Sequence, residues 1–332
     1  MCAHRAVILY NPVARGLLRR GRSLERCIGV LAGRGIEARL VATTGPGSAG
    51  GQARREIEAG CDLMIAAGGD GTINEVANGM LHSPVPLAIL PGGTANVLAH
   101  EMGLPLDLEK AAARIPQLHP VPIAVGRLRI PGSPPRLFLC MTGAGLDAQI
   151  VYHVNRNLKA ALGKLAYYAS SFRQVFRPLC EFEVCVESER FKASFALISR
   201  VRNYGGDLEI ARGASLLRDD FEVVLFRGMQ SVGYLRYLAA VLIGRAHRVR
   251  GCTVLRGQSV VCRCPEELAA SNRQTTKNDG LPHPDIYVQV DGELAGTLPI
   301  TAEIVPAALK LSMPAEYLAR EQERPAAPVR HG

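Results

Sequence analysis

The sequence predicts an N-terminal doubly wound α/β domain followed by a β-rich, sandwich-like domain. Strand and helix patterns alternate up to Pro116, which is typical of a parallel sheet covered by helices. Beyond Pro122, short apolar segments of strand character follow one another with few helical patterns between them. A chain of 332 residues is also long for one domain. We therefore expect domains over residues 1–122 and 123–313, with the last strand able to return to the first domain, and a flexible tail over 314–332.

Apolar patterns define the expected elements of the first domain. Strands are expected at 6–10, 36–42, 63–67 and 87–90, and helices near 17–33, near 51–59, from 72 onward and over 97–102. Thr72 and Glu75 have the spacing of a capping box, which predicts that the third helix begins at Thr72. Gly103 and Pro105 are expected to end the fourth.

A glycine-rich loop joins the third strand to the third helix, with the sequence Gly68-Gly69-Asp70-Gly71-Thr72. A helix N-terminus presents backbone N–H groups and a positive dipole end, and glycines let the backbone approach a phosphate closely. Asp70 would repel that phosphate unless a cation lies between them, which points to Mg²⁺. The alternative is an ordinary tight turn, in which Asp-Gly is common.

Two further loops of the same kind follow the first and fourth strands. The fourth strand leads into Pro91-Gly92-Gly93-Thr94-Ala95-Asn96, where Thr94 or Asn96 is expected to cap the next helix. The first strand leads into Asn11-Pro12-Val13-Ala14-Arg15-Gly16. Because the carboxyl ends of parallel strands lie along one edge of the sheet, the three loops are expected to converge there.

The second domain is expected to contain a series of strands interrupted by two helical stretches. Strands are predicted at 121–130, 137–141, 182–187, 191–199, 221–226, 253–262, 286–290 and 299–311, and helices near 158–176 and 232–243. The polar, proline-flanked segment 265–284 is expected to be a long loop.

The net charge of +9 calls for an anionic partner or for a basic face that is simply solvated. Aromatic residues make up only 5% of the chain, Trp is absent, and no nucleic-acid-binding motif occurs, so we expect no nucleic acid partner. Basic clusters at 15–22 and 245–250 suit an anionic substrate or an anionic membrane surface.

The chain is expected to be cytoplasmic, with peripheral membrane association left open. It has neither a long apolar stretch nor the apolar region of a signal peptide near its start. Its nine cysteines are scattered mostly within apolar runs, the usage of free thiols in a reducing compartment.

Together these motifs resemble the diacylglycerol kinase catalytic-domain family, in particular its soluble bacterial members, which are related to sphingosine kinases. The resemblance covers about residues 5–313. It is carried by Gly68–Glu75, Leu90–Asn96, Asn11-Pro12, Gly143–Asp147, Leu158–Lys164, Asn203–Gly206 and Val290–Glu293. The Gly-Gly-Asp-Gly-Thr block alone is shared with NAD kinases and, more loosely, with phosphofructokinases. The motifs in the second half of the chain therefore decide in favour of lipid kinases.

The resemblance implies a phosphofructokinase-like first domain and transfer of phosphate from ATP, with Mg²⁺, to a lipid hydroxyl. The nucleotide site would consist of Asn11, Pro12, Arg15, Thr43, Gly68, Gly69, Asp70, Gly71, Thr72, Gly92, Gly93, Thr94 and Asn96. Glu293 matches the proton acceptor of the family. Asp70 would hold the catalytic metal directly or through water, or would itself be the base.

The resemblance also implies a structural Mg²⁺ held by Asp219 and by the backbone carbonyls of Leu216 and Phe221. The family usually has Asp-Gly at this place, whereas this chain has Asp219-Asp220. The conformational freedom of a glycine is lost and a carboxylate is gained, so the sequence does not decide whether this metal site is retained.

Two alternatives remain beside a lipid kinase: an enzyme like NAD kinase, and a catalytically silent protein that binds lipid or nucleotide. The preferred acceptor is diacylglycerol or a related lipid alcohol. Sphingoid bases, phosphatidylglycerol and undecaprenol-like alcohols are also consistent, because apolar pockets discriminate poorly among chains. A homodimer is compatible with the sequence, but no feature requires one.

Overall fold

The computed structural model of the chain describes residues 4–18, 23–145, 180–205, 208–228, 251–264 and 286–324. Several predictions lie outside these ranges: the helices near 158–176 and 232–243, the loop 265–284, the basic cluster 245–250 and the motif Leu158–Lys164. Within them, no helix is both long and apolar enough to cross a membrane.

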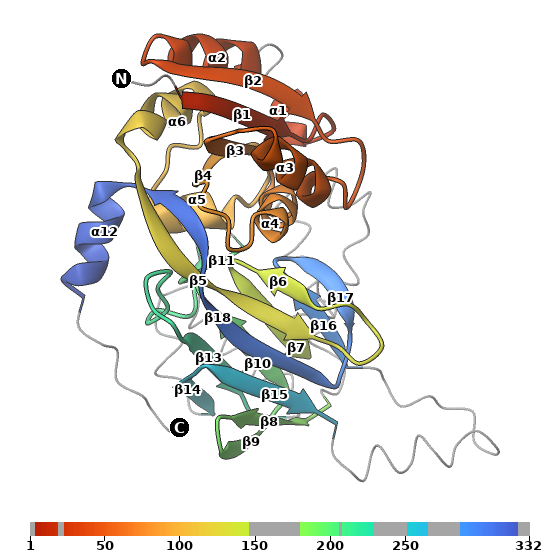
Figure 1. Cartoon of the computed structure of the whole chain (residues 1–332). Helices are drawn as coiled ribbons and strands as arrows, with labels where there is room; N and C mark the ends of the chain where they lie inside the picture. Colours follow the sequence, from red (N-terminus) through yellow and green to blue (C-terminus); the bar gives the residue numbers. More distant parts are fainter. Residues whose placement is uncertain are drawn as a thin grey trace.

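The first domain is the predicted α/β domain, with a parallel sheet in the order β2-β1-β3-β4 (Figure 1). Its strands are β1 (His4–Tyr10), β2 (Ile36–Ala42), β3 (Leu63–Gly68) and β4 (Leu87–Pro91). Its helices are α1 (Arg15–Leu18), α2 (Ser23–Ala32), α3 (Ala49–Glu58), α4 (Asp70–Gly79), α5 (Val97–Met102) and α6 (Leu108–Arg114), followed by the 3₁₀ turn η1 (Ile115–Gln117).

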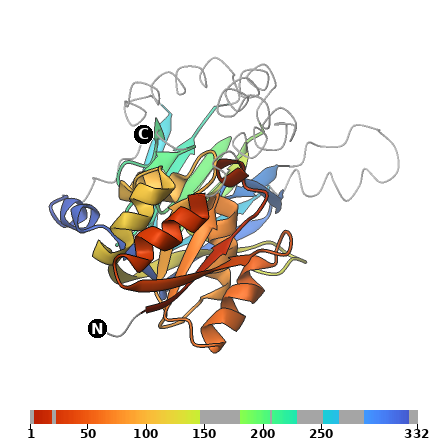
Figure 2. The ribbon, with the colours of Figure 1, turned by 90° about the horizontal axis from the view of Figure 1, so that it is seen from above.

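Alternating apolar residues of the strands bury both faces of this sheet. Ile8 and Ile65 pack on the side of α2 and α6, whereas Leu9 and Met64 pack on the side of α3 and α4. Seen from above in Figure 2, the helices lie on both sides of the sheet. The carboxyl ends of β1, β3 and β4 therefore lie together at one uncovered edge.

The second domain is a sandwich of two sheets, as predicted. One sheet continues the first domain and contains β5 (His119–Arg129), β6 (Arg136–Phe138), β8 (Phe182–Val186), β9 (Glu189–Ala193), β15 (Ser259–Arg263) and β18 (Ile300–Met313). The other contains β7 (Met141–Gly145), β10 (Phe195–Ser199), β13 (Phe221–Phe226), β14 (Cys252–Gly257), β16 (Tyr287–Val290) and β17 (Glu293–Thr297). The short β11 (Asn203–Tyr204) and β12 (Leu208–Glu209) pair separately.

Three of the predicted strands are each two strands that lie in different sheets. The predicted strand 137–141 is β6 and β7, 191–199 is β9 and β10, and 253–262 is β14 and β15; in each pair one strand belongs to each sheet. The apolar pattern runs through these corners because both strands face the core between the sheets, so periodicity does not reveal where the chain bends. The prediction also missed β17.

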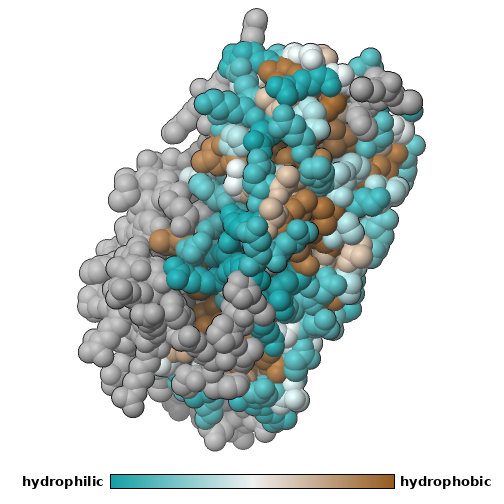
Figure 3. Space-filling model, turned by 90° about the vertical axis from the view of Figure 1, so that its left-hand side faces the viewer, coloured by the Kyte–Doolittle hydropathy of each residue, from teal (hydrophilic) through white to brown (hydrophobic). Residues whose placement is uncertain are grey.

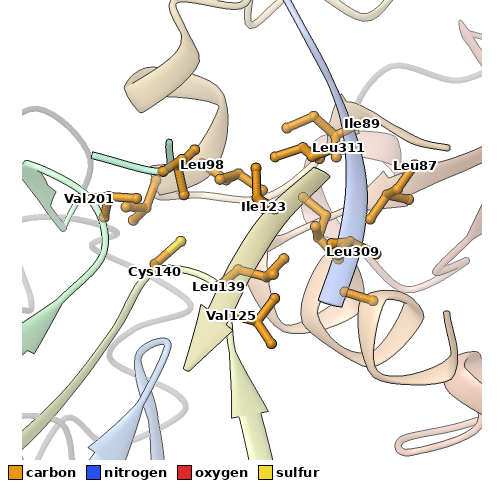
Figure 4. Close-up of a cluster of buried hydrophobic side chains, with 14 of the residues drawn as sticks. Leu87, Ile89, Leu98, Ile123, Val125, Leu139, Cys140, Val201, Leu309 and Leu311 are labelled. Carbon is orange, nitrogen blue, oxygen red and sulfur yellow. The ribbon is translucent and has the colours of Figure 1, made fainter. Parts of the chain in front are cut away.

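β18 joins the two domains. Near its end Leu311 pairs with Leu87 of β4 in parallel, and near its start Ala302 pairs with Val260 of β15 in antiparallel register. β5 runs antiparallel along β18 (Figure 1). Residues from both domains form one buried cluster around this joint (Figure 4), among them Leu87, Ile89, Ile123, Val125, Leu139 and Leu311. The relative placement of the two domains is thus set by a shared sheet and a shared core.

The flexible tail predicted over 314–332 is wrong for its first part, because residues Ala315–Gln322 form the helix α12. Tyr317 is almost fully buried, and its hydroxyl accepts a hydrogen bond from the Leu216 N–H at 3.2 Å. Glu316 forms an ion pair with Arg114. The polar composition misled the prediction because polar residues of this helix are themselves bound to the rest of the protein: Arg320 donates to the Glu101 carbonyl at 2.8 Å and Glu321 pairs with Arg202. On the side where α12 lies, the surface is mostly hydrophilic, with hydrophobic residues in small groups (Figure 3).

Candidate active site

The three predicted loops converge on one cavity of about 690 Å³ at the carboxyl edge of the parallel strands. Of the residues predicted to bind nucleotide, it is lined by Asn11, Pro12, Thr43, Gly69, Gly71, Thr72, Gly92, Gly93 and Thr94. Glu293, from the second domain, lines the same cavity. The structure therefore brings together most of the residues that the sequence pointed to.

Backbone contacts hold the loops against one another. The Gly92 N–H donates to the Gly68 carbonyl at 2.8 Å, and the Gly92 carbonyl accepts from the Gly16 N–H at 3.0 Å. A Cβ atom at Gly93 would lie 2.5 Å from the Cα of Gly69, so any side chain there would force the two loops apart. The amide of Asn11 donates to the Thr72 hydroxyl at 3.4 Å. Glycine is needed here for close approach of one backbone to another.

The helix after the first glycine loop begins at Asp70, with Gly69 as its N-cap and no side-chain cap. The predicted capping box is therefore wrong. The carboxylate of Glu75 instead accepts from the N–H groups of Gly47 at 3.0 Å and Ala49 at 3.2 Å, at the beginning of α3. The first N–H groups of α4 have no acceptor within the helix, and Gly71 and Thr72 face the cavity.

Four predicted nucleotide residues do not line the cavity. Gly68 ends the buried strand β3, and the side chain of Arg15 lies outside the described part of the chain. Asn96 has a left-handed backbone, and its side chain accepts from the Gly93 N–H at 2.8 Å and donates to the Gly93 carbonyl at 3.1 Å. Asn96 therefore holds the N-cap position of α5, as predicted, but its side chain shapes the second glycine loop and makes no capping bond to the helix.

Asp70, the fourth of these residues, lies beneath the loop. Its Oδ1 atom accepts from the Leu98 N–H, near the start of α5, at 3.5 Å. Burial raises the pKa of this carboxyl above its usual value, while hydrogen bonds from backbone N–H groups of Leu98, Val97 and Asn96 act in the opposite direction. Asp70 is thus oriented by the start of α5, next to the cavity formed by its neighbours.

Glu293 lies directly after the turn between β16 and β17 and is exposed. Its Oε1 atom lies against Gly71 in the first turn of α4, so close that a Cβ atom on Gly71 would be 2.7 Å away. Its Oε2 atom is 3.3 Å from Nη2 of Arg136. The second domain thus places a carboxylate across the N-terminus of the helix that carries the glycine loop.

Asp291 anchors that turn. Its Oδ1 atom accepts from the N–H groups of Cys140 at 3.0 Å and Met141 at 2.8 Å. Its Oδ2 atom accepts from the Leu139 N–H at 3.0 Å and from the Asn74 amide at 2.6 Å. Burial raises the pKa of this carboxyl to about 6, and the four hydrogen bonds limit the rise.

Asn74 connects this anchor to α4. Its side-chain amide also donates to the Leu137 carbonyl at 3.0 Å, and its side-chain oxygen Oδ1 accepts from the Asn78 amide at 2.8 Å. The Leu137 N–H in turn donates to Asn78 at 3.3 Å. Asn74 and Asp291 both lie in the motifs that carry the family resemblance, but the sequence predicted a role for neither. Their polar character within the motifs was the signal, and only their juxtaposition shows what they do.

A second cavity, of about 900 Å³, adjoins the first. Pro46, Gly71, Glu75 and Glu293 line both of them. Arg54 and Arg136 add positive charge to the second cavity. The arrangement provides a cavity lined by the glycine loops, a neighbouring cavity with basic side chains, and two carboxylates where they meet. Of these, Glu75 is bound by the N–H groups of Gly47 and Ala49, whereas Glu293 comes from the second domain.

The predicted structural metal site is not supported by the residues around it. The Leu216 carbonyl accepts from a buried arginine, Arg200, at 3.0 Å. Asp219 is exposed, and Phe221 begins β13 opposite Gly257.

Comparison with known proteins assigns a family to both domains. The model described as the diacylglycerol kinase catalytic domain matches residues 5–128, and that described as the YegS C-terminal NAD kinase beta sandwich-like domain matches residues 140–313. A diacylglycerol kinase of Bacillus subtilis (strain 168) is 31% identical over 248 residues, which are 72% of this chain and 79% of that protein.

A diacylglycerol kinase of Staphylococcus epidermidis (strain ATCC 12228 / FDA PCI 1200) is 27% identical over 303 residues, covering 89% of this chain and 87% of the relative. Among solved structures, a diacylglycerol kinase from Bacillus anthracis str. Sterne shares the fold, with a TM-score of 0.73 and 21% identity over 95% of this chain and 99% of that one. With family models matching both domains, the chain belongs to the diacylglycerol kinase catalytic-domain family and is a kinase.

Proposed function

We propose that the chain transfers the γ-phosphoryl group of ATP to the hydroxyl of a lipid, most simply diacylglycerol or a related lipid alcohol. ATP would bind in the cavity of about 690 Å³ and the acceptor in the adjoining cavity of about 900 Å³. The observation that carries this proposal is the position of Glu293, which lines both cavities and contacts Gly71 at the N-terminus of α4.

The nucleotide side would work through the backbone. Phosphoryl transfer requires in-line positioning and neutralisation of charge on the phosphate oxygens, with little covalent help from the protein. The N–H groups at the start of α4 are suited to phosphate oxygens, because they have no acceptor within the helix and Gly71 and Thr72 line the cavity. Thr94 is exposed at the cavity and can donate a hydrogen bond to a phosphate or ribose oxygen.

The carboxyl group of Asp70 suits Mg²⁺ that arrives with ATP, held directly or through water. Mg²⁺ commonly binds one or two carboxylates together with substrate phosphates and keeps several waters. The Asp70 carboxyl lies beneath the glycine loop, next to the cavity in which the phosphates would bind. When bound, Mg²⁺ would supply positive charge to the phosphate oxygens.

Glu293 would be the base. An alcohol is a far weaker acid than a carboxylic acid, so Glu293 would mainly orient the hydroxyl and accept its proton late in the transition state. Asp70 is less suited to this role, because it lines neither cavity and its Oδ1 faces the start of α5.

The acceptor would be reached at an anionic membrane surface. The net charge of +9, together with Arg54 and Arg136 beside the second cavity, supports this part of the proposal. Sedimentation with vesicles tests it: binding is expected to vesicles that contain phosphatidylglycerol, not to pure phosphatidylcholine, and is expected to weaken as salt is raised.

The first experiment is transfer of labelled phosphate from ATP, with Mg²⁺, to a panel of lipids in mixed micelles. The panel contains diacylglycerol, a sphingoid base, phosphatidylglycerol and a polyprenol, and NAD is assayed in parallel. Asp70→Asn and Glu293→Gln are compared with the wild type. Glu303→Gln is the matched control, because Glu303 is a half-exposed glutamate that also pairs with an arginine but lines neither cavity.

A phosphorylated lipid that is lost in Asp70→Asn and Glu293→Gln, and retained in Glu303→Gln, is the expected result and would also identify the acceptor. Phosphorylation of NAD alone would replace the proposal with an NAD kinase. Binding of ATP without transfer to any acceptor would leave a protein that kept the fold and lost the reaction.

A further inference from the structure

A charged side chain is fully buried in the second domain, far in sequence from the glycine loops. Arg200 directly follows β10 and has no exposed surface. Its Nη2 atom donates to the carbonyls of Leu216 and Ala124, each at 3.0 Å. Its Nη1 atom donates to the carbonyl of Asp220 at 2.9 Å and also to that of Arg218. Four backbone carbonyls thus converge on one guanidinium group.

This guanidinium remains charged at neutral pH. Burial lowers the pKa of Arg200 to about 10, and the nearby carboxylates of Asp219 and Asp220 act in the opposite direction. A buried positive charge is tolerated where it is hydrogen-bonded, and the four carbonyls accept from its two Nη atoms, while its buried Nε has no partner among the described residues. The group is therefore an internal cation surrounded by backbone oxygens, three of them from the loop 216–220.

The same loop is where the family resemblance implies a structural Mg²⁺, and the donor set does not fit that ion. Mg²⁺ requires oxygen ligands at about 2.1 Å in near-octahedral geometry. The Leu216 carbonyl, one of the expected ligands, is already bound by Arg200. A divalent ion beside it would also place two positive charges next to each other in a buried site.

The departure from Asp-Gly fits the same picture. The carboxylate of Asp220 forms a two-point contact with Arg218, at 3.0 Å and 2.7 Å, and lies 3.6 Å from Nε of Arg256. The exposed Asp219 contributes its backbone carbonyl to the amide of Gln258 at 3.0 Å. The carboxylate that this chain has in place of the usual glycine therefore pairs with two arginines, Arg218 and Arg256.

We propose that Arg200 takes the place of the structural cation in this protein. Its guanidinium holds the loop 216–220 against β5, so the second domain needs no divalent ion to keep its shape. The Mg²⁺ requirement of the chain is then confined to the nucleotide cavity. This inference does not depend on the proposed lipid acceptor.

The loop is also connected to the turn that carries Glu293. The Arg200 N–H donates to the Cys140 carbonyl at 2.8 Å, and the Cys140 N–H donates to Asp291 at 3.0 Å. One residue therefore separates the internal cation from the anchor of the turn. Because this link uses the backbone N–H of Arg200, the guanidinium affects it by fixing the backbone at this position. Arg200 is therefore a positioning residue, which acts on the site only through Cys140 and Asp291.

Thermal unfolding in the absence of nucleotide and lipid tests the proposal on the wild-type chain. The melting temperature is measured in EDTA and in Mg²⁺ up to about 10 mM, with Asp70→Asn alongside to detect ions bound near the glycine loop. The expected wild-type shift is less than about 1 °C. A saturable rise of about 5 °C or more that persists in Asp70→Asn would overturn the proposal.

Asp220→Gly provides the sharpest comparison, because it restores the Asp-Gly of the family while keeping Arg200. Since Arg200 still binds the carbonyls, this variant is expected to remain insensitive to Mg²⁺. If it instead gains a Mg²⁺-dependent rise in melting temperature, Asp220 excludes the ion and the proposal is wrong.

Arg200→Ala tests the guanidinium itself. It is expected to melt at a lower temperature, and added guanidinium ion at about 10 mM, far below denaturing concentrations, is expected to raise that temperature while leaving the wild type unchanged. Recovery of kcat in parallel would identify the positioning role. An Arg200→Ala protein as stable and as active as the wild type would contradict the proposal; if it does not fold, the wild-type titration still decides.

Discussion

The glycine loop at 68–72 and the turn at 291–293 reach the same cavity by different means. The loop is contiguous in sequence, and the ends of β3 and α4 place it. The turn is held by Asp291, whose carboxylate is bound by three backbone N–H groups at 139–141 and by Asn74. The half of the site formed by the glycine loop is therefore local, whereas the half with Glu293 depends on contacts across the domains.

The largest expected effect is that of Glu293→Gln. The amide keeps the shape of the side chain but cannot accept the proton, so kcat should fall about 10²- to 10⁴-fold. KM for ATP should change little, because the backbone loops make most of the cavity. Steady-state kinetics with Glu303→Gln as control measures this. A kcat near that of the wild type would remove Glu293 from the chemistry.

Asp291→Asn should lower kcat somewhat less than Glu293→Gln does, by about 10²-fold. The asparagine offers one acceptor oxygen and one donor where the carboxylate accepts four hydrogen bonds, so the turn and Glu293 shift. A displacement of about 1 Å at a reacting group costs about this much. The melting temperature is measured together with kcat. Loss of activity only in proportion to loss of folded protein would argue against a positioning role.

The pH profile gives an independent test of the same anchor. With a pKa of about 6, Asp291 is ionised and accepts four hydrogen bonds above that pH, and it carries a proton below it. The proton faces N–H donors and disrupts the anchor, so kcat/KM should fall about tenfold per pH unit below about pH 6. In Asp291→Asn this limb should disappear from the measured profile. Its persistence would assign it to another group.

Gly71→Ala examines the contact between the two halves. The new Cβ atom would lie 2.7 Å from Oε1 of Glu293, which is the end of a flexible side chain and can move aside. We expect kcat to fall about tenfold with the fold intact. Gly29→Ala in α2 serves as control, since its Cβ would meet nothing within 4 Å and Gly29 lines neither cavity. Equal kinetics of the two variants would show that Glu293 tolerates displacement.

The smallest effect is expected for Arg136→Ala. The ion pair between Arg136 and Glu293 is solvent-exposed on both sides, and such pairs contribute about 0–1 kcal/mol. The change in kcat should therefore be less than about fivefold at moderate salt. A much larger loss, measured with the acceptor lipid saturating, would mean that Arg136 contacts the substrate.

Much of the first domain could be predicted from the sequence, because each element reports its own environment. The strand at 36–42 and the helix at 97–102 have the predicted bounds, since short apolar runs and terminal glycines are local signals. Glu75 shows the limit of such signals. Its spacing from Thr72 matches a capping box, but packing of α3 against α4 offers its carboxylate other N–H donors.

The sequence by itself determined the kinds of element, the three loops at one sheet edge and the motif that contains Glu293. It also revealed Asp220 as a departure from the family. Only the tertiary structure decided which residues Asp291 binds, where Glu293 lies relative to Gly71, and that Arg200 meets the carbonyls near Asp220. The physical reason is that a hydrogen bond between residues far apart in the chain depends on how whole sheets pack, which no local pattern encodes.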